Sequence, residues 1–505
     1  MRELLLNNSE KDVSNKVIIY GAGMVGNLVR HFFEINNIAE RICAVAVSEE
    51  PDIDYMWGYR YECIDNLIDE IRECLVIVAT FPEHHSLIVN RLKSLGANRI
   101  YTMNFESYQQ FAKEYMDYYV ENHLLNDFYD ILYFPSDNNC TSGAFLSLVN
   151  LVQDINKRGL KTLVILPEYG NGEELLMDND IEYTFVPSNT WLKRLDGKAL
   201  SWQQLVEVDN YKAIKRIEKI IEECEVKLVH CNTTYTYVGA KAAQNKKIPV
   251  VWHLREKTIE QGYIYDDEKE FYSLINSSDQ IITVSQYIKD NYEKLDRNKT
   301  VIIYNGIDVD RYYNQHLVFD NPIIKIIMPG AIYPLKRQKD LVEAVALLKK
   351  KSISVSVDIV GTGEVDYVKE LKSIVEKNQI QSQINFMGKR NHLEELYKQY
   401  DIVVSCSGVE SFGRVCVEGQ LSGCLVIGAN SGGTLEIIKN KENGLLFDYQ
   451  NSKSLADTIE YAIKNVDEMR KIALSGQKYA MEHLNKEYNS KQIYEIYRNL
   501  IKVGE

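Results

Sequence analysis

Two glutamates in a glycine-rich stretch, Glu410 and Glu418, have the type and spacing that most suggest chemistry. On one continuous helix, this separation would place them about 80° apart and roughly 12 Å along the axis. At that distance the two carboxylates cannot act on one reacting atom as an acid/base pair. The spacing fits better if Glu410 lies in the loop before a helix and Glu418 lies two turns inside it. Both would then contact different points of one long ligand.

Glycine-containing loops follow four consecutive apolar runs in the same region, and one of these loops carries cations. Glycine lets the backbone approach a ligand closely, and the free N–H groups at a helix start bind anionic oxygens. A nucleoside diphosphate with an attached polar group would use all of these loops, with cations for the phosphates and carboxylates for the hydroxyl groups. The residues concerned are Gly330, Lys336, Arg337, Lys339, Gly361, Gly363, Gly413, Gly432, Gly433 and Thr434.

Length, charge and cysteine usage narrow the classes of protein. At 505 residues the chain is long enough for about two to four domains, each with its own core. The formal charge of −14 argues against nucleic acid or an anionic membrane as the main partner. The nine cysteines form no C-x-x-C pair, so no zinc or disulfide framework is expected, and a reducing cytoplasm is the expected location. No apolar run reaches the length of about 18 residues that spans a membrane, and the first residues do not resemble a signal peptide.

The elements that must position these residues follow a repeating pattern. Short apolar runs that end in Gly, Asn or Ser alternate with longer amphipathic segments. This pattern is typical of parallel sheets covered by helices, so we expect an α/β protein whose ligands bind at the carboxyl ends of the strands. The predicted parts are a Rossmann-like N-terminal module over 1–105, a helical connector over 106–128, two further Rossmann-like units over 129–307 and 308–485, and a final amphipathic helix over 486–505.

The N-terminal module contains the pattern G-x-G-x-x-G at Gly21, Gly23 and Gly26, directly after an apolar run. That context suits pyrophosphate at a helix N-terminus, and Glu49 lies near the place of a ribose-binding acid. The alternative is that the glycines only form the turn and let helix and strand pack closely. No catalytic base or nicotinamide pocket is identified, so a dehydrogenase is not expected, and NAD, another nucleotide or no ligand in this module stay open. The module resembles the small Rossmann-like modules fused to bacterial surface-polysaccharide enzymes.

The stretch "GVESFGRVCVEGQLSGCLVIGANSGGTLEII" resembles the E-x7-E signature of family 4 glycosyltransferases, which are retaining enzymes with the GT-B fold. The preceding motifs occur in the family's order: "VIIYNGID", "GAIYPLKRQKDLVEA", "DIVGTGE" and "YDIVVSCSGVESFG". The resemblance covers about residues 130–500. It implies an acceptor domain at 129–307 and a nucleotide-sugar donor domain at 308–485 that face a cleft, with the C-terminal helix packing back across it.

The same resemblance implies roles on the donor side. Lys336 and Glu410 are expected catalytic residues: Lys336 would bind the donor pyrophosphate, with Arg337 beside it, and Glu410 would hold hydroxyls of the donor sugar. Glu418 would hold the ribose. Many members have arginine where this chain has Ala331, so more of the phosphate charge would fall on Lys336. The other expected donor contacts are Gly143, Gly330, Gly363, Phe412, Gly413, Gly432, Gly433 and Thr434.

The middle unit is expected to hold the acceptor. Ser142 and Gly143 would lie in the cleft near the donor phosphate and the acceptor. The segment "VVWHLRE" matches the family's strand-end histidine, which makes His253 the third expected catalytic residue, facing the sugar. Arg255 and Glu256 would line the acceptor pocket. Taken alone, a histidine at a strand end is more often a buried core residue, and that is the alternative for His253.

The resemblance implies transfer of a sugar from a nucleotide-sugar, a UDP-sugar in particular, to a glycan or lipid-linked acceptor in surface polysaccharide synthesis. No D-x-D placed to hold a metal is identified, and no cofactor besides the nucleotide-sugar is expected. A GT-B epimerase or phosphorylase would need a base-and-acid set or a Schiff-base lysine that is not found. A non-catalytic nucleotide-sugar sensor or scaffold is the alternative from another class. The expected location is the cytoplasm, where the basic segment 210–221 would contact the inner face of the membrane or form a solvated helix face.

Overall fold

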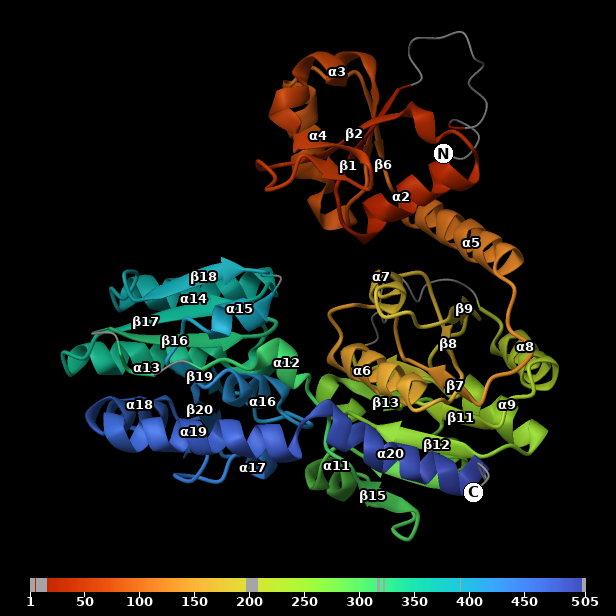
Figure 1. The fold of residues 1–505 in the computed structure, drawn as a ribbon. Coiled ribbons are helices and arrows are strands. Elements are labelled where there is room, and N and C mark those ends of the chain that lie inside the picture. Colours follow the sequence, from red (N-terminus) through yellow and green to blue (C-terminus); the bar gives the residue numbers. More distant parts are fainter. Residues whose placement is uncertain are drawn as a thin grey trace.

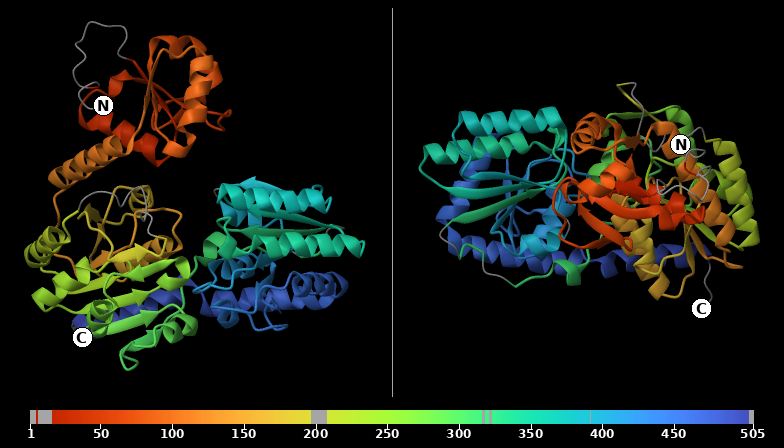
Figure 2. Two further views of the ribbon diagram at one scale, coloured as in Figure 1. Left: turned by 180° about the vertical axis from the view of Figure 1, so that it is seen from behind. Right: turned by 90° about the horizontal axis from the view of Figure 1, so that it is seen from above.

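The computed structural model describes residues 16–196, 208–315, 318–320, 323–390 and 392–501, together with Leu5. Within them the chain forms three units, each built on a mainly parallel sheet, and the predicted α/β class is confirmed. In Figure 1 the N-terminal unit stands above the other two, which lie side by side. Figure 2 shows the same arrangement from behind and from above. None of the helices in these residues is both long and apolar enough to cross a bilayer.

The N-terminal unit has the strand order β3-β4-β2-β1-β5-β6, in which only β3 and β4 pair antiparallel. The order changes direction between β1 and β5, which is where ligands bind in open α/β sheets. The strands are β1 (Val17–Tyr20), β2 (Ile42–Val47), β3 (Tyr55–Met56), β4 (Tyr59–Cys63), β5 (Leu75–Val78) and β6 (Arg99–Thr102). The helices are α2 (Met24–Ile35), α3 (Ile68–Glu73) and α4 (His85–Ser94).

A single helix, α5 (Phe105–Asn122), connects this unit to the next. Phe111 of α5 stacks on Phe32 of α2, with 3.8 Å between the ring centroids. Further along the helix, Tyr115 packs edge-on against Tyr169 of the middle unit at 5.2 Å. One continuous apolar core therefore extends from the N-terminal unit through α5 into the middle unit.

The middle unit has a sheet of the order β15-β14-β12-β11-β7-β8-β9, with every pair parallel. Its central strands are buried on both faces, which explains their near-continuous runs of Val, Ile and Leu. The strands are β7 (Ile131–Phe134), β8 (Thr162–Leu166), β9 (Tyr183–Phe185), β11 (Leu228–Cys231), β12 (Val250–Leu254), β14 (Gln280–Thr283) and β15 (Thr300–Ile302), and a separate antiparallel pair joins β10 (Leu192–Arg194) to β13 (Tyr263–Tyr265). The helices are α6 (Gly143–Lys157), α7 (Glu173–Met177), α8 (Asn210–Glu223), α9 (Val238–Lys246), α10 (Glu268–Asn276) and α11 (Gln286–Asn291).

The C-terminal unit has a parallel sheet of the order β18-β17-β16-β19-β20-β21. The strands are β16 (Ile324–Pro329), β17 (Val355–Val360), β18 (Ile384–Gly388), β19 (Ile402–Ser405), β20 (Leu425–Ala429) and β21 (Leu445–Phe447). The helices are α12 (Val309–Tyr312), α13 (Gln338–Lys350), α14 (Val365–Lys377), α15 (Leu393–Tyr397), α16 (Arg414–Leu421), α17 (Thr434–Ile437), α18 (Ser452–Lys464) and α19 (Val466–His483).

The last helix, α20 (Lys486–Ile501), leaves the C-terminal unit and lies along the middle unit (Figures 1 and 2). Tyr497 of α20 is fully buried there, and its hydroxyl lies 2.7 Å from His230 Nδ1. The two segments that cross between the units lie together, because Ile307 and Asn485 form a β-bridge.

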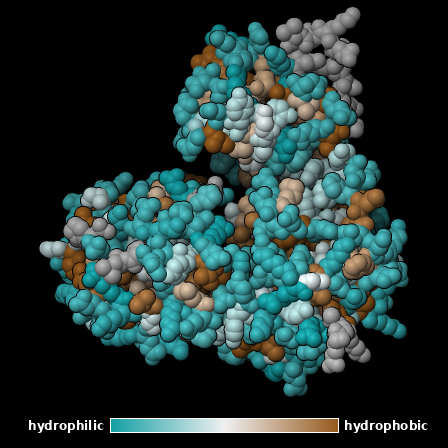
Figure 3. Space-filling model, in the orientation of Figure 1, coloured by the Kyte–Doolittle hydropathy of each residue, from teal (hydrophilic) through white to brown (hydrophobic). Residues whose placement is uncertain are grey.

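The surface that Figure 3 presents is mainly hydrophilic, with apolar residues in small separate patches. Helix α8 contains the basic segment 210–221, for which contact with the membrane was considered above. Its apolar residues Ala213, Ile217 and Ile221 are buried in the core of the middle unit. These side chains are therefore occupied within the fold, and the structure favours the alternative of a solvated polar helix face.

Candidate active site

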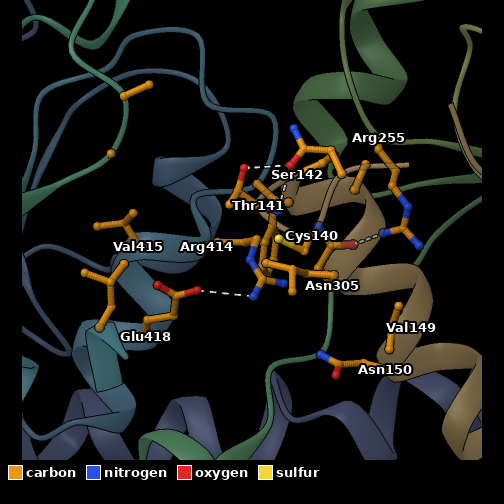
Figure 4. A pocket seen from close by; sticks show the side chains of 18 of the residues that line it. Cys140, Thr141, Ser142, Val149, Asn150, Arg255, Asn305, Arg414, Val415 and Glu418 are labelled. Atoms are coloured by element: carbon orange, nitrogen blue, oxygen red, sulfur yellow. Dashed lines mark hydrogen bonds and ion pairs between the residues drawn. The ribbon is translucent and has the colours of Figure 1, made fainter. Parts of the chain in front are cut away.

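A cavity of about 1390 Å³ lies between the middle and C-terminal units, and Figure 4 shows part of it from close by. Both walls are built largely from loops that follow strands, after β7, β8 and β12 on one side and after β16, β17, β18 and β19 on the other. Ligand sites of open α/β sheets lie at this edge. Since pockets for one small ligand run from about 300 to 1,000 Å³, this cavity has room for two substrates.

Lys336 and Glu410 form an ion pair on the C-terminal wall of the cavity. Lys336 ends a short turn, Pro334–Lys336, that follows β16, and Glu410 lies in the loop between β19 and α16. Burial by itself would lower the pKa of Lys336, but the attraction of the Glu410 carboxylate outweighs it and raises that pKa. The ammonium group therefore stays charged, with Glu410 as its partner.

Helix α16 begins at Arg414, directly after Gly413, whose φ of +92° favours glycine. Glu418 therefore lies little more than one turn inside the helix, and the prediction of two turns is wrong because the left-handed Gly413 delays the helix start. Glu418 is buried and accepts hydrogen bonds from the Tyr397 hydroxyl (3.0 Å) and from Arg414 Nη2 (3.2 Å). It also lines the cavity, and a carboxylate with two such bonds can accept further ones from a ligand.

The other residues predicted for the donor side fall into two groups. Those that line the cavity are Gly330, Phe412 and Gly413. Those that are not part of the cavity wall are Arg337, Gly363, Gly432, Gly433 and Thr434. The Gly433 amide donates a hydrogen bond to the Glu410 carbonyl (2.7 Å), and a Cβ at position 433 would lie 2.6 Å from the Ser411 carbonyl oxygen. Gly433 therefore packs closely against the loop that carries Glu410 and stabilises it with a backbone hydrogen bond, without lining the cavity itself. Arg337 is already paired with Asp340, with Nε 2.6 Å from Oδ2.

On the opposite wall, Ser142 and Gly143 form the start of α6, as the cleft position predicted for them requires. The Ser142 hydroxyl caps the helix by accepting a hydrogen bond from the Phe145 amide (3.4 Å), and it donates one to Asp137 (3.2 Å). A Cβ at position 143 would lie 3.3 Å from Arg414 Cδ. The two walls meet at this point, where a glycine leaves room for the arginine.

Arg255 follows β12 and lines the cavity, whereas His253 is fully buried behind it and is not part of the wall. The guanidinium of Arg255 donates to Asn232 Oδ1 (2.8 Å) and to Asn305 Oδ1, and its Nη2 lies 3.2 Å from His253 Nδ1. Burial lowers the pKa of Arg255 to about 9. Burial and the neighbouring Arg255 keep the pKa of His253 well below its usual range, so the imidazole is neutral. Arg255, and not His253, presents its side chain to the cavity in this structure.

Three carboxyl groups of the middle unit also line the cavity: Asp137, Glu168 and Glu256. Burial raises the pKa of all three, to about 8 for Glu168 and to about 7 for Glu256. Glu256 accepts hydrogen bonds from the amide and the hydroxyl of Thr234, both at 2.8 Å. Since Glu168 and Glu256 are partly protonated near neutral pH, this wall can donate as well as accept hydrogen bonds.

Sequence reasoning missed Arg414, Asp137 and Glu168. Arg414 stands four residues before Glu418, which is the spacing of an ion pair on a helix. Asp137 and Glu168 come shortly after the apolar runs 131–134 and 162–166. These local signals exist, but they do not indicate that the three residues meet at one cavity.

The glycine loop of the N-terminal unit has features of both interpretations, namely close packing of the turn against the helix and an accessible helix N-terminus. Gly21 has a φ of +121°, and a Cβ at position 26 would lie 1.9 Å from the Gly21 carbonyl oxygen. Close packing therefore explains Gly21 and Gly26. Gly23, at the start of α2, has open space around its Cα and leaves the helix N-terminus accessible. Whether a nucleotide binds there stays a prediction.

Across the described ranges, no group of three or more His, Cys, Asp or Glu side chains is arranged to hold a metal ion. The nine cysteines are free thiols, and seven of them are buried.

The sequence of the chain matches two protein-family models. The model for Glycosyltransferase Family 4 matches residues 141–311, and the model for Glycosyl transferases group 1 matches residues 309–479. The two matches meet between the middle and C-terminal units and together include most of both walls of the cavity.

Individual known proteins are also similar to this chain. The chain is 27% identical over 279 residues to an uncharacterized glycosyltransferase of Methanocaldococcus jannaschii, a match that spans 53% of this chain and 74% of the relative. It is 24% identical over 238 residues to N-acetyl-alpha-D-glucosaminyl L-malate synthase of Bacillus anthracis, over 45% of this chain and 61% of the relative. Among solved structures, Anabaena HepE in complex with UDP and glucose matches with a TM-score of 0.61 and 23% identity, over 74% of this chain and 100% of the other.

Proposed function

Because this chain belongs to the family 4 type of GT-B glycosyltransferases, we propose that it transfers a sugar from a UDP-sugar to a glycan or lipid-linked acceptor, with retention of configuration. The Lys336–Glu410 ion pair, on one wall of a cavity with room for two substrates, carries this proposal. UDP and glucose in the structurally similar HepE support UDP as the nucleotide. The name of the Bacillus anthracis relative contains malate, which supports an acceptor that carries negative charge.

Donor binding exchanges one charge-assisted contact for another. A donor phosphate replaces Glu410 as the partner of Lys336, so the ammonium group keeps an anionic neighbour. Glu410 is then free to accept hydrogen bonds from hydroxyls of the transferred sugar. The N–H groups at the start of α16 add positive potential beside the phosphates, and Glu418 has acceptor capacity left for the ribose. The open space at Gly330, whose φ is +133°, lets the backbone of that loop approach the donor closely.

In the proposed reaction, an acceptor hydroxyl oxygen forms a bond to the anomeric carbon while the bond from that carbon to the phosphate oxygen breaks. The hydroxyl proton passes to the leaving phosphate on the same face of the sugar, so the configuration is retained. Lys336 and the start of α16 stabilise the charge that develops on the diphosphate. Closure of the two units around the substrates would exclude water and strengthen these contacts.

The proposed setting is polysaccharide synthesis in the cytoplasm. Free thiols fit a reducing compartment. The resemblance of the N-terminal unit to modules fused to surface-polysaccharide enzymes supports the polysaccharide role. The second candidate, a non-catalytic nucleotide-sugar sensor, rests on the same Lys336 and Glu410 contacts and differs only in turnover.

Thermal melting of the full chain with UDP, GDP, ADP and NAD tests the donor site. A ligand at 100 times its dissociation constant adds about 2.7 kcal/mol to the free energy of unfolding. We expect a higher melting temperature with UDP, and loss of that shift in Lys336→Ala. Lys339→Ala is the matched control, because this exposed lysine pairs with Glu370 (2.8 Å) on the surface. An equal UDP shift in Lys336→Ala, or a shift with NAD alone, would contradict the proposal.

A measurement of turnover distinguishes a glycosyltransferase from a non-catalytic nucleotide-sugar sensor. UDP release from a panel of UDP-sugars should be measurable with the wild-type protein and should fall at least about tenfold in Glu410→Gln, because the lost contacts form to the reacting sugar. UDP itself should still bind to the variant. Binding of UDP without release from any UDP-sugar would favour the sensor, and unchanged turnover in Glu410→Gln would remove Glu410 from the site.

A further inference from the structure

The guanidinium group of Arg255 is buried in the cavity wall; Glu256 attracts it, but among the described residues no carboxylate forms an ion pair with it. It is 7% exposed, and its contacts are the side-chain oxygens of Asn232 and Asn305 and a ring nitrogen of His253. The neighbouring Glu256 directs its carboxylate to the amide and hydroxyl of a threonine instead. A guanidinium has five N–H donors, so the charge and part of the donor capacity of Arg255 remain for a ligand.

A buried cation without a negative partner is unfavourable, because it has lost its hydration. The low pKa of Arg255, about 9, is the direct expression of this burial. The residue is still protonated at neutral pH, and its positive charge adjoins the cavity. An anion in the cavity would supply a direct ionic contact in addition to the attraction of Glu256.

Arg414 brings a second guanidinium to the cavity from the C-terminal unit, and in Figure 4 the side chain of Asn305 lies between the two arginines. Nη1 of Arg414 lies 3.1 Å from Ser147 Oγ of α6, and its Nη2 lies 3.2 Å from Glu418 Oε1. The two arginines are close enough for Arg414 to contribute to the low pKa of Arg255. Arg414 forms an ion pair with Glu418, and the two guanidinium groups still repel each other, which favours binding of an anion here.

The start of α6 faces the same part of the cavity. Ser142, Gly143 and Ala144 line the wall, and α6 is 15 residues long. The N-terminus of such a helix attracts anions through its free N–H groups. Two guanidinium groups and this helix start thus come from three separate segments of the chain and adjoin one space.

We infer that Arg255, Arg414 and the start of α6 hold an anionic group of the acceptor, either a phosphate or a carboxylate. The inference rests on the proposed function, which assigns the wall with Lys336 and Glu410 to the donor. Arg255 belongs to the middle unit, and Arg414 reaches from the C-terminal unit to Ser147 of the middle unit, so the two arginines lie where the proposed donor and acceptor walls meet. The acceptor class is then an anion-bearing glycan, lipid-linked glycan or small acid.

Inorganic phosphate is the probe that tests this assignment. Calorimetric titration of phosphate into the full chain saturated with UDP reports sites other than the donor phosphate positions. We expect phosphate to bind to the wild-type complex and to bind at least about tenfold more weakly to Arg414→Gln, because charge-assisted hydrogen bonds are lost. The affinity for UDP, measured with the same proteins, should change much less.

Arg311→Gln is the matched control. Arg311 also lines the cavity, but it already forms an ion pair with Glu394 (3.1 Å), so its loss should leave phosphate binding unchanged. Arg414→Lys keeps the positive charge but lacks the planar guanidinium that binds an anion through two N–H groups, so it should bind phosphate with intermediate affinity. Melting curves of all variants establish that they are folded.

Two outcomes would overturn the inference. Equal phosphate binding by the wild type and Arg414→Gln would mean adventitious binding elsewhere. Weaker UDP binding by Arg414→Gln, with phosphate binding to the UDP complex unchanged, would assign the arginines to the donor. Failure of the wild type to bind UDP would contradict the proposed function instead. In that case titration of phosphate without UDP still decides whether Arg414 binds an anion.

Discussion

Replacing Glu173 with glutamine tests a buried carboxyl group that connects the N-terminal unit to the cavity wall. Glu173 is 5% exposed at the start of α7. Its Oε2 accepts a hydrogen bond from the Tyr115 hydroxyl of α5 (2.7 Å), and its Oε1 accepts one from Asn138 Nδ2 (3.2 Å). Asn138 is the neighbour of the cavity residue Asp137 in the sequence. Burial raises the pKa of Glu173 to about 7.

The raised pKa makes the stability of this region depend on pH. Below about pH 4.5, the ordinary pKa of glutamate, Glu173 is protonated in both the folded and the unfolded chain and contributes no pH dependence. Between that pH and about 7, the unfolded chain loses the proton first, so the free energy of unfolding falls as the pH rises. The whole decrease amounts to about 3 kcal/mol. Glutamine keeps an acceptor oxygen and has no proton to lose, so the variant avoids this decrease.

Melting temperatures measured from about pH 5 to about pH 8 give the assay. The wild type and Glu173→Gln should nearly coincide at the acidic end. At the alkaline end the variant should melt higher by about 6–12 °C, because 1 kcal/mol shifts a unit of 150–250 residues by about 2–4 °C. Glu174→Gln, at an exposed position on the same helix, should follow the wild type. A difference between Glu173→Gln and the wild type that is constant over this range would refute the reasoning.

Two further substitutions have expected outcomes. Gly26→Ala should lower the melting temperature of the N-terminal unit by the equivalent of about 1–3 kcal/mol, because its Cβ would lie 1.9 Å from the Gly21 carbonyl oxygen. Gly23→Ala, in open space, is its control, and equal effects of the two would contradict the packing argument. Tyr497→Phe should lower the free energy of unfolding of the middle unit by about 1 kcal/mol, because the hydrogen bond to His230 is lost. Urea unfolding followed by fluorescence would measure this loss, and no change in the midpoint would mean that the bond does not contribute.

The grouping of the residues that we propose to bind the donor could be predicted from the sequence to a large extent. Glu410, Glu418 and Lys336 lie in or directly after glycine loops at strand ends, and consecutive residues determine the chemistry of each loop. All three line one cavity in the structure. The helix start was misplaced, because a residue such as Gly413 adopts a left-handed conformation that spacing alone does not reveal.

Contacts between distant segments could not be predicted. Arg414 and Ser147 are separated by 267 positions and belong to different units, and neither has a local pattern that names the other. His253 and Arg255 lie two positions apart, so the alternation of a strand places them on the same side. The sequence does not show that Arg255, just past the strand end, covers His253. The strands β9 and β10 have three residues each, too few for a recognisable alternation.

Helix α20 has a consequence for the synthesis of the chain on the ribosome. The strands and helices of the middle unit are complete by residue 302, but its core also contains Tyr497. At roughly 5–20 residues per second, roughly 10–40 s pass between translation of these two points. During this interval the apolar surface that α20 later covers stays exposed to solvent and prone to association. One half of the active site is thus finished only after the other half has been made.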